Sequence, residues 1–107
     1  MRVYISGAIS NNPDYKWDFA KAKALIVAAG HEAVNPAEVT INGGTWLDFM
    51  RHDIKLLADC EGVYMLAGWE QSKGACVEHQ LAQGLGLKIY YEEKKNDRRK
   101  ENKTKEV

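Results

Sequence analysis

The sequence predicts an α/β domain of the three-layer, Rossmann or flavodoxin-like type, with four or five mostly parallel strands and helices on both faces of the sheet. Short β-type runs alternate with longer segments of helical periodicity, in the order β-α-β-α-β-α-β. Such alternation leads to parallel pairing through right-handed crossovers. The run at 62–66 is apolar throughout, which is typical of a strand covered on both faces.

The composition bounds the class of protein. With 107 residues, of which 45% are hydrophobic, the chain has enough material for one core and one domain. Fifteen Lys and Arg residues balance fifteen Asp and Glu residues, so the formal net charge is zero. This balance argues against a protein that binds duplex nucleic acid, which usually carries a basic excess, but it allows a local site for a small anion.

Membrane, export and metal signals are missing from the pattern. No apolar run approaches the roughly 18–20 residues that span a bilayer. Met1 leads directly into a strand-like run, so we expect no membrane segment and no signal peptide. Cys60 and Cys76 have no framework spacing, so we expect reduced thiols in a cytoplasmic protein. No Cys and His residues have zinc-like spacing, so we expect no metal.

The first half of the chain predicts two strands around one helix. Residues 2–5 form a β-type run that ends at a Ser-Gly turn signal. Asp14 is the expected N-cap of a helix that ends near Gly30. Residues 31–34 form the second strand. The expected apolar face of the helix is Trp17, Ala20, Ala24 and Val27, widened by Phe19 and Ile26.

The second half predicts two more helices and two more strands. Thr45 caps a helix over 46–58, and the third strand follows at 62–66. A serine caps the helix over 72–85, which glycines bracket at its end, and the fourth strand spans 87–91. The apolar stripe of the middle helix is Trp46, Leu47, Phe49, Met50, Ile54 and Leu57.

The charged C-terminal segment falls outside this pattern. Residues 1–91 form the expected domain, and residues 92–107 form a charged, flexible tail. A solvated charge run accounts for this composition better than an arm that binds nucleic acid.

The order of the elements predicts where a ligand binds. In open parallel sheets, ligands bind beyond the carboxyl ends of the strands. The loops at 6–12, 35–45 and 67–72 each follow a strand, so they gather at this one edge.

Several side chains at that edge have both a functional and a plain reading. Gly7 lets a ligand approach the backbone, or simply forms a tight turn. Ser72 and Gly74 open a helix whose free N–H groups favour an anion, although ordinary capping also explains the serine. Glu78, one turn beyond Gly74, can face the same pocket or be an exposed helical acid. Asp53, taken alone, is a surface acid on the preceding helix.

Four runs in the sequence together resemble the nucleoside 2-deoxyribosyltransferase superfamily, and within it the small phage and bacterial proteins of unknown function. The resemblance covers residues 1 to about 91. The runs are Tyr4-Ile5-Ser6-Gly7-Ala8-Ile9, His52-Asp53-Ile54-Lys55, Asp59-Cys60-Glu61-Gly62-Val63-Tyr64-Met65-Leu66 and Ser72-Lys73-Gly74-Ala75-Cys76-Val77-Glu78-His79.

The resemblance implies an active site built from Tyr4, Asp53 and Glu78. Ser72 and Gly74 match the phosphate-binding positions of one branch, the deoxynucleoside 5′-monophosphate N-glycosidases. The deoxyribosyltransferases themselves tend to carry an acid at the serine position, so the match favours a nucleotide over a nucleoside. The loop after the first strand adds the remaining expected substrate contacts: Gly7, Ile9, Ser10 and Asn11.

This chain also departs from the glycosidase branch. Ser10 and Asn11 stand where that branch has a basic residue and a glycine, and Cys76 stands where it has another glycine.

The implied reaction is cleavage of the bond between base and deoxyribose through a covalent glycosyl intermediate on Glu78. A retaining scheme uses one carboxylate as nucleophile and a second group as acid and then base. Asp53 orients Glu78, protonates the leaving base, or does both. Tyr4 bonds to Glu78 and keeps it aimed. Neither a cofactor nor a metal is needed.

Aromatic residues near the expected site have more than one reading. Trp69 stacks on the base, or packs over a neighbouring helix or a partner subunit. Trp46, Phe49 and Met50 are expected in the core or at a dimer contact, and His79 is expected to be structural or interfacial. The resemblance implies a homodimer.

Three other functions stay open from the sequence. In the first alternative, the protein transfers deoxyribose between bases as a deoxyribosyltransferase does. In the second, it binds a nucleotide or sugar phosphate without cleaving it. A flavin protein is the weakest alternative, because the first loop lacks a dense run of Ser and Thr hydroxyls.

Overall fold

Four strands form one parallel sheet in the order β2-β1-β3-β4. The computed structural model describes residues 1–39 and 44–93. This confirms the predicted three-layer α/β class, with four strands that are all parallel. The strands are β1 (Arg2–Ser6), β2 (Glu32–Val34), β3 (Gly62–Met65) and β4 (Lys88–Tyr91).

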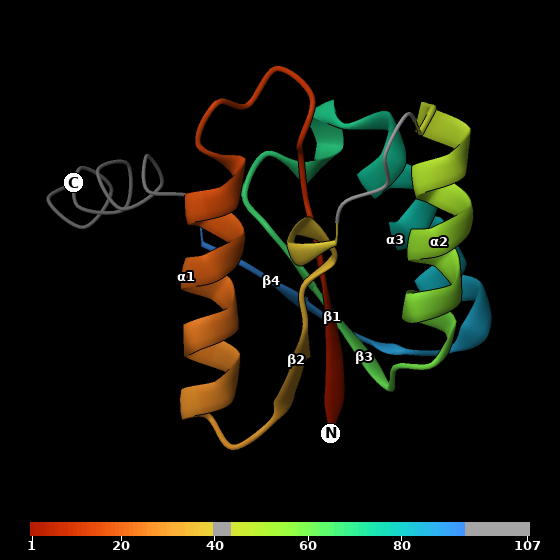
Figure 1. Cartoon of the computed structure of the whole chain (residues 1–107). Coiled ribbons are helices and arrows are strands. Elements are labelled where there is room, and N and C mark those ends of the chain that lie inside the picture. Colours follow the sequence, from red (N-terminus) through yellow and green to blue (C-terminus); the bar gives the residue numbers. More distant parts are fainter. Residues whose placement is uncertain (40–43, 94–107) are drawn as a thin grey trace, which may run out of the picture.

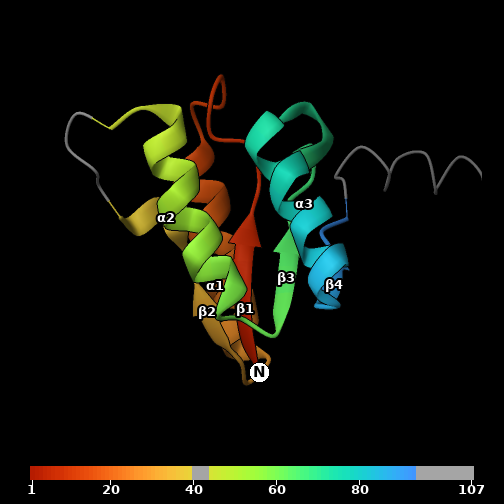
Figure 2. The same ribbon diagram turned by 90° about the vertical axis from the view of Figure 1, so that its right-hand side faces the viewer.

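Helices cover both faces of this sheet (Figures 1 and 2). Helix α1 (Tyr15–Ala28) packs on one face, and α2 (Trp46–Ala58) and α3 (Lys73–Leu85) pack on the other. Two short 3-10 turns, η1 (Pro36–Glu38) and η2 (Trp69–Gln71), follow β2 and β3.

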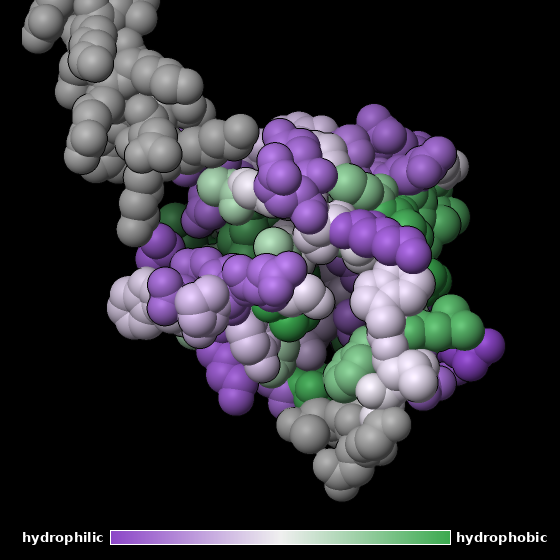
Figure 3. Space-filling model, turned by 90° about the horizontal axis from the view of Figure 1, so that it is seen from above, coloured by the Kyte–Doolittle hydropathy of each residue, from purple (hydrophilic) through white to green (hydrophobic). Residues whose placement is uncertain are grey.

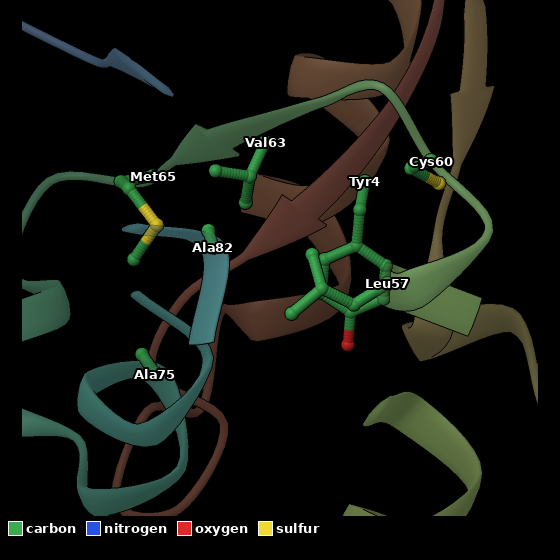
Figure 4. Packing of buried hydrophobic residues seen from close by; sticks show 7 residues of the cluster. All are labelled: Tyr4, Leu57, Cys60, Val63, Met65, Ala75 and Ala82. Atoms are coloured by element: carbon green, nitrogen blue, oxygen red, sulfur yellow. The ribbon is translucent and has the colours of Figure 1, made fainter. Parts of the chain in front are cut away.

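The alternation of β1 divides the core into two halves. Val3 and Ile5 pack with α1, whereas Tyr4 points to the opposite face and packs with α2 and α3. Figure 4 shows Tyr4 beside Leu57 in this second half. Strand β1 is buried from Val3 to Ser6, as expected for an inner strand of a sheet that is covered on both faces.

Three of the predicted helix signals are confirmed, those of Thr45, Ser72 and Gly86. Thr45 and Asp48 form a reciprocal capping box at the start of α2. The Ser72 hydroxyl accepts a hydrogen bond from the Ala75 N–H at the start of α3, and Gly86 ends that helix with φ of 74°. Asp14 precedes α1 as expected, but its side chain makes no capping bond.

The predicted apolar face of α1 is correct for Phe19 and Ile26, which are buried, and wrong for Trp17, Ala20, Ala24 and Val27, which are exposed. The residues that α1 buries are Phe19, Ala22 and Ile26, which recur at three- and four-residue spacing. Trp17 is 67% exposed and Val27 is also exposed, so most of the predicted stripe faces solvent. Helix α1 has apolar residues on two faces, and periodicity alone does not say which face meets the sheet.

The domain also extends one residue into the predicted tail. The Glu92 N–H donates to the Met65 carbonyl, and the Glu92 carboxylate accepts a bond from the Ala67 N–H. Residues 40–43 and 94–107, and with them the rest of the tail, lie outside the described part of the chain.

The described residues also bear on the expected thiols, membrane segment and metal site. Cys60 and Cys76 are free thiols. Within residues 1–39 and 44–93 no helix is long and apolar enough to cross a membrane. The same residues hold no cluster of three or more His, Cys, Asp or Glu side chains suited to a metal ion.

Candidate active site

A cavity of about 380 Å³ opens at the edge where the strands end. It is lined by the segments that follow β1 and β2 and by the N-terminal parts of α2 and α3. The carboxyl edge of the sheet is the expected ligand position in such folds. Figure 3 looks down on this edge and shows apolar surface between hydrophilic groups. The lining residues are Gly7, Ile9, Ser10, Tyr15, Pro36, Ala37, Val39, Trp46, Phe49, Met50, Asp53, Ser72, Gly74, Ala75 and Glu78.

Glu78 is a buried carboxylate on the wall of this cavity. It lies in the second turn of α3 and is only 5% exposed. Its Oε2 accepts a hydrogen bond of 2.6 Å from the Tyr4 hydroxyl, and its Oε1 accepts one of 2.6 Å from the Ser6 hydroxyl. Such short O–H···O distances are typical of bonds to an ionised carboxylate. Two hydroxyls from strand β1 therefore hold the Glu78 carboxylate in one orientation.

The surroundings of Glu78 bring its titration into the neutral range. Burial raises its pKa from 4.5 to about 7, the hydrogen bonds from Ser6 and Tyr4 lower it, and the nearby Asp53 charge raises it. Burial and the negative charge of Glu78 also raise the pKa of Tyr4 far above its usual range. The Tyr4 phenol therefore stays a proton donor at every physiological pH.

Asp53 reaches the same cavity from α2. Its side chain is mostly buried, with 13% exposed, and its Oδ1 lies 3.4 Å from Nδ1 of the adjacent His52. Burial raises the pKa of Asp53, and the neighbouring His52 lowers it in part. Two carboxylates with raised pKa values thus line one cavity, an arrangement that enzymes use for acid–base and nucleophilic work.

The N-terminus of α3 borders the cavity on another side. Ser72 and Gly74 both line it. The first N–H groups of a helix have no partner within the helix and favour negative charge. The Lys73 ammonium lies 4.5 Å from the centroid of the Trp46 ring, itself a lining residue. The lining residues with a formal charge, Asp53 and Glu78, are both acidic.

Gly7 lines the cavity, and close packing against Leu66 also requires a glycine at this position. A Cβ at this position would lie 2.7 Å from the Leu66 Cδ1 and 2.8 Å from the Leu66 Cβ. No side chain therefore fits between β1 and the end of β3. The close approach that the glycine permits is to Leu66.

The structure brings together most of the predicted site residues. Seven of them line the cavity, and Tyr4 lies behind Glu78 at hydrogen-bonding distance. Asn11 and Trp69 do not line it. Trp69 instead stacks on His79 at 4.2 Å between ring centroids, and the His79 Nε2 lies 2.7 Å from the Tyr91 hydroxyl. The alternative reading of Trp69, packing over a neighbouring helix, describes this contact.

Sequence reasoning missed Ser6 and the aromatic wall. Ser6 was read as a turn residue, yet it closes β1 on the face that Tyr4 shares. The period-two rule would have found it, because residues two apart on a strand point to the same side. Trp46, Phe49 and Met50 all line the cavity. Met50 is also buried, as expected for a core residue, whereas Trp46 and Phe49 are partly exposed at the cavity wall.

One known family matches most of the chain. Residues 1–91 match the model of a family described as a domain of unknown function, DUF4406. The chain belongs to this family.

Among solved structures, the chain is similar to a 2-deoxyribosyltransferase from the psychrotolerant bacterium Bacillus psychrosaccharolyticus. The TM-score is 0.67 and the identity 15%, over 85% of this chain and 71% of the other. The resemblance that the motifs indicated is thus confirmed at the level of the fold. No curated protein matches the sequence.

Proposed function

We propose that this protein hydrolyses the N-glycosidic bond of a deoxynucleoside 5′-monophosphate. The observation that carries the proposal is Glu78, a buried carboxylate that is held by two hydroxyls and shares its cavity with a second carboxylate, Asp53. The motif resemblance and the shared fold with a 2-deoxyribosyltransferase support chemistry at the anomeric carbon of a deoxyribose.

In the first step, a Glu78 oxygen attacks C1′ of the sugar. A bond forms between that oxygen and C1′ while the bond from C1′ to the base nitrogen breaks, and the bonding electron pair leaves with the base. Asp53, whose pKa burial raises, donates the proton that the departing base takes up.

In the second step, water attacks C1′ and releases Glu78. The bond from C1′ to Glu78 breaks, and Asp53 takes the proton of the attacking water. The products are free base and deoxyribose 5-phosphate. Oriented hydroxyls from Tyr4 and Ser6 keep Glu78 in place without adding charge.

The phosphate is proposed to bind at the start of α3. Ser72 and Gly74 supply a hydroxyl and helix N-terminal N–H groups there, and Lys73 is the nearby cation. Lys73 matters because Asp53 and Glu78, which share the cavity, repel an anion. The aromatic rings of Trp46 and Phe49 suit the flat face of a base.

Two other functions use the same cavity. In a deoxyribosyltransferase, a second base replaces water in the second step. In a binding module, the nucleotide stays intact. The carboxylate pair favours an enzyme, since a protein that only binds an anion gains nothing from two acids beside it.

The test is base release from a panel of deoxynucleoside 5′-monophosphates and the matching nucleosides, followed by chromatography. We expect the wild type to release base from a monophosphate. Glu78→Gln should lose at least about a thousandfold in rate while still binding substrate, because its neutral amide cannot attack C1′. Glu32→Gln, an exposed change on β2, is the matched control and should keep full activity.

The other outcomes separate the alternatives. Release from nucleosides alone, or only when an acceptor base is added, would make the protein a deoxyribosyltransferase. Binding of monophosphates with no release from either set would contradict the enzyme proposal and favour the binding module.

A further inference from the structure

Ser6 is a second hydroxyl on Glu78 that the motif resemblance does not assign. Its side chain is 1% exposed, and it donates to the carboxylate oxygen that Tyr4 leaves free. The resemblance implies Tyr4, Asp53 and Glu78 for this site. The hydrogen bond from Ser6, a second donor on β1, is known only from this structure.

The two donors restrict the carboxylate in a way that one donor does not. The terminal torsion of a Glu side chain is broad and roughly two-fold, so a single bond to one oxygen leaves the plane of the group free to turn. Tyr4 holds Oε2 and Ser6 holds Oε1. Together they fix both the position and the plane of the carboxylate.

The backbone that carries Ser6 is itself fixed on the neighbouring strand. Ser6 pairs with Met65 in the parallel register of β1 and β3, and its carbonyl accepts a hydrogen bond of 2.8 Å from the Leu66 N–H. A hydroxyl on a central strand is a more rigid anchor than one on a loop. The short serine side chain brings the Glu78 carboxylate down onto the last residue of β1, beside the cavity.

We infer that Ser6 is a positioning residue that holds Glu78 as an oriented, ionised carboxylate. This inference rests on the proposed function for its kinetic consequence, but not for its effect on Glu78 itself. The groups that act on Glu78 are Tyr4 and Ser6 from β1 and Asp53 from α2. Ser6 and Tyr4 favour its charged form, and Asp53 opposes it.

The direct test is a pH titration of the substrate-free protein, in which the carboxyl carbon of Glu78 is followed by ¹³C NMR. We expect Ser6→Ala to raise the pKa of Glu78 by about one unit, because a hydrogen bond to a charged group is lost. Ser6→Thr keeps a hydroxyl and should titrate as the wild type does. Tyr64→Phe removes a hydroxyl from β3 on the α1 side of the sheet, and it should leave the Glu78 titration unchanged.

The near-isosteric Ser6→Cys keeps the test informative if the alanine variant fails to fold. A thiol is a weaker donor than a hydroxyl, so the pKa of Glu78 should rise, but by less than in the alanine variant. An unchanged Glu78 titration in the folded alanine or cysteine variant would overturn the inference.

The kinetic readout separates positioning from packing. On a substrate that the wild type cleaves, Ser6→Ala should lower kcat by about ten- to a hundredfold with KM within a factor of three, and Ser6→Thr should restore most of the rate. A rise in KM with kcat unchanged would contradict a positioning role. If no substrate is cleaved, the proposed function fails while the titration still decides the role of Ser6.

Discussion

At the residue scale, Glu78 combines two properties that oppose each other. The nucleophile that we propose must be ionised, whereas burial disfavours the charged form and raises the pKa of Glu78 to about 7. The hydrogen bonds from the Tyr4 and Ser6 hydroxyls stabilise the charged form and so lower the pKa of Glu78 in part, without supplying a positive charge. The protein therefore carries a carboxylate that titrates near neutral pH and whose ionised form opposes folding.

This opposition predicts how the stability depends on pH. The pKa of Glu78 is higher in the folded protein than the value of 4.5 in the unfolded chain. Between about pH 4.5 and 7 the folded state keeps a proton that the unfolded state has lost, so the contribution of Glu78 to stability falls as the pH rises through this window. The gap corresponds to at most on the order of 3 kcal/mol, since one pKa unit is about 1.4 kcal/mol.

Glu78→Gln removes this titration. Relative to the wild type, the variant should therefore gain stability between pH 4.5 and pH 8, by up to about 3 kcal/mol. Urea unfolding of both proteins at several pH values measures the difference. Two stability curves that run parallel over this range would show that the pKa of Glu78 is not raised by folding.

Some residues of the candidate site could be predicted from the sequence, because local motifs and helix starts determine where they lie. Glu78 and Tyr4 belong to motifs whose order matches the superfamily, and the start of α3 at Ser72 fixed the side on which Glu78 lies. Trp69 could not be placed in this way. Its partners His79 and Tyr91 come from α3 and β4, and only the tertiary fold decides that these rings stack.

At the element scale, the bounds of the helices and strands followed from local signals, whereas the buried faces did not. Thr45 and Ser72 mark the starts of α2 and α3 by side-chain capping. Helix α1 carries apolar residues on two faces, and only packing against the sheet determines that the Phe19 face is buried and the Trp17 face is exposed. The aromatic start of α2 lines the cavity, and its sequence pattern is the same as that of a core-facing helix.

The contact of α2 with α3 at the cavity predicts the effect of filling Gly74. A Cβ there would lie 3.1 Å from the Met50 Sδ and 3.7 Å from the Trp46 Nε1, and both residues line the cavity. Methionine is flexible, and alanine favours a helix over glycine. Gly74→Ala should therefore change the free energy of unfolding by less than about 1 kcal/mol while weakening ligand binding at least about tenfold.

Gly84 is the matched control in the same helix, because among the described residues no atom beyond its own helix backbone and chain neighbours lies within 4 Å of a Cβ built there. Gly84→Ala should add up to about 1 kcal/mol of stability and leave affinity unchanged. Calorimetric titration with a deoxynucleoside 5′-monophosphate, on the Glu78→Gln background to prevent turnover, gives both affinities. Equal affinities in the two glycine variants would mean that the ligand does not reach the start of α3.

At the scale of the whole molecule, the topology alone predicts the edge of the sheet at which the cavity opens. A parallel sheet with the order β2-β1-β3-β4 places the ends of all its strands at one edge, and the cavity opens at that edge, against the segments that follow β1 and β2. The alternation of strands and helices in the sequence was enough to predict this edge. It was not enough to predict the cavity wall, whose aromatic part comes from α2 packing beside α3.

The homodimer, the cytoplasmic location and the choice of a nucleotide substrate stay predictions at this scale. They depend on surfaces, compartments and ligands rather than on the fold. The exposed Trp17 face of α1 is apolar surface available to a partner, and nothing within the described chain identifies what would cover it.

The central claim is that Glu78 forms a covalent bond to the sugar. Intact-protein mass spectrometry after acid quenching of a reaction with the best monophosphate substrate tests this most directly. We expect a fraction of the wild type to gain the mass of one deoxyribose 5-phosphate unit, fragmentation to locate it on Glu78, and Glu78→Gln to show no gain. Base release without any adduct, or an adduct on another residue, would contradict the role assigned to Glu78.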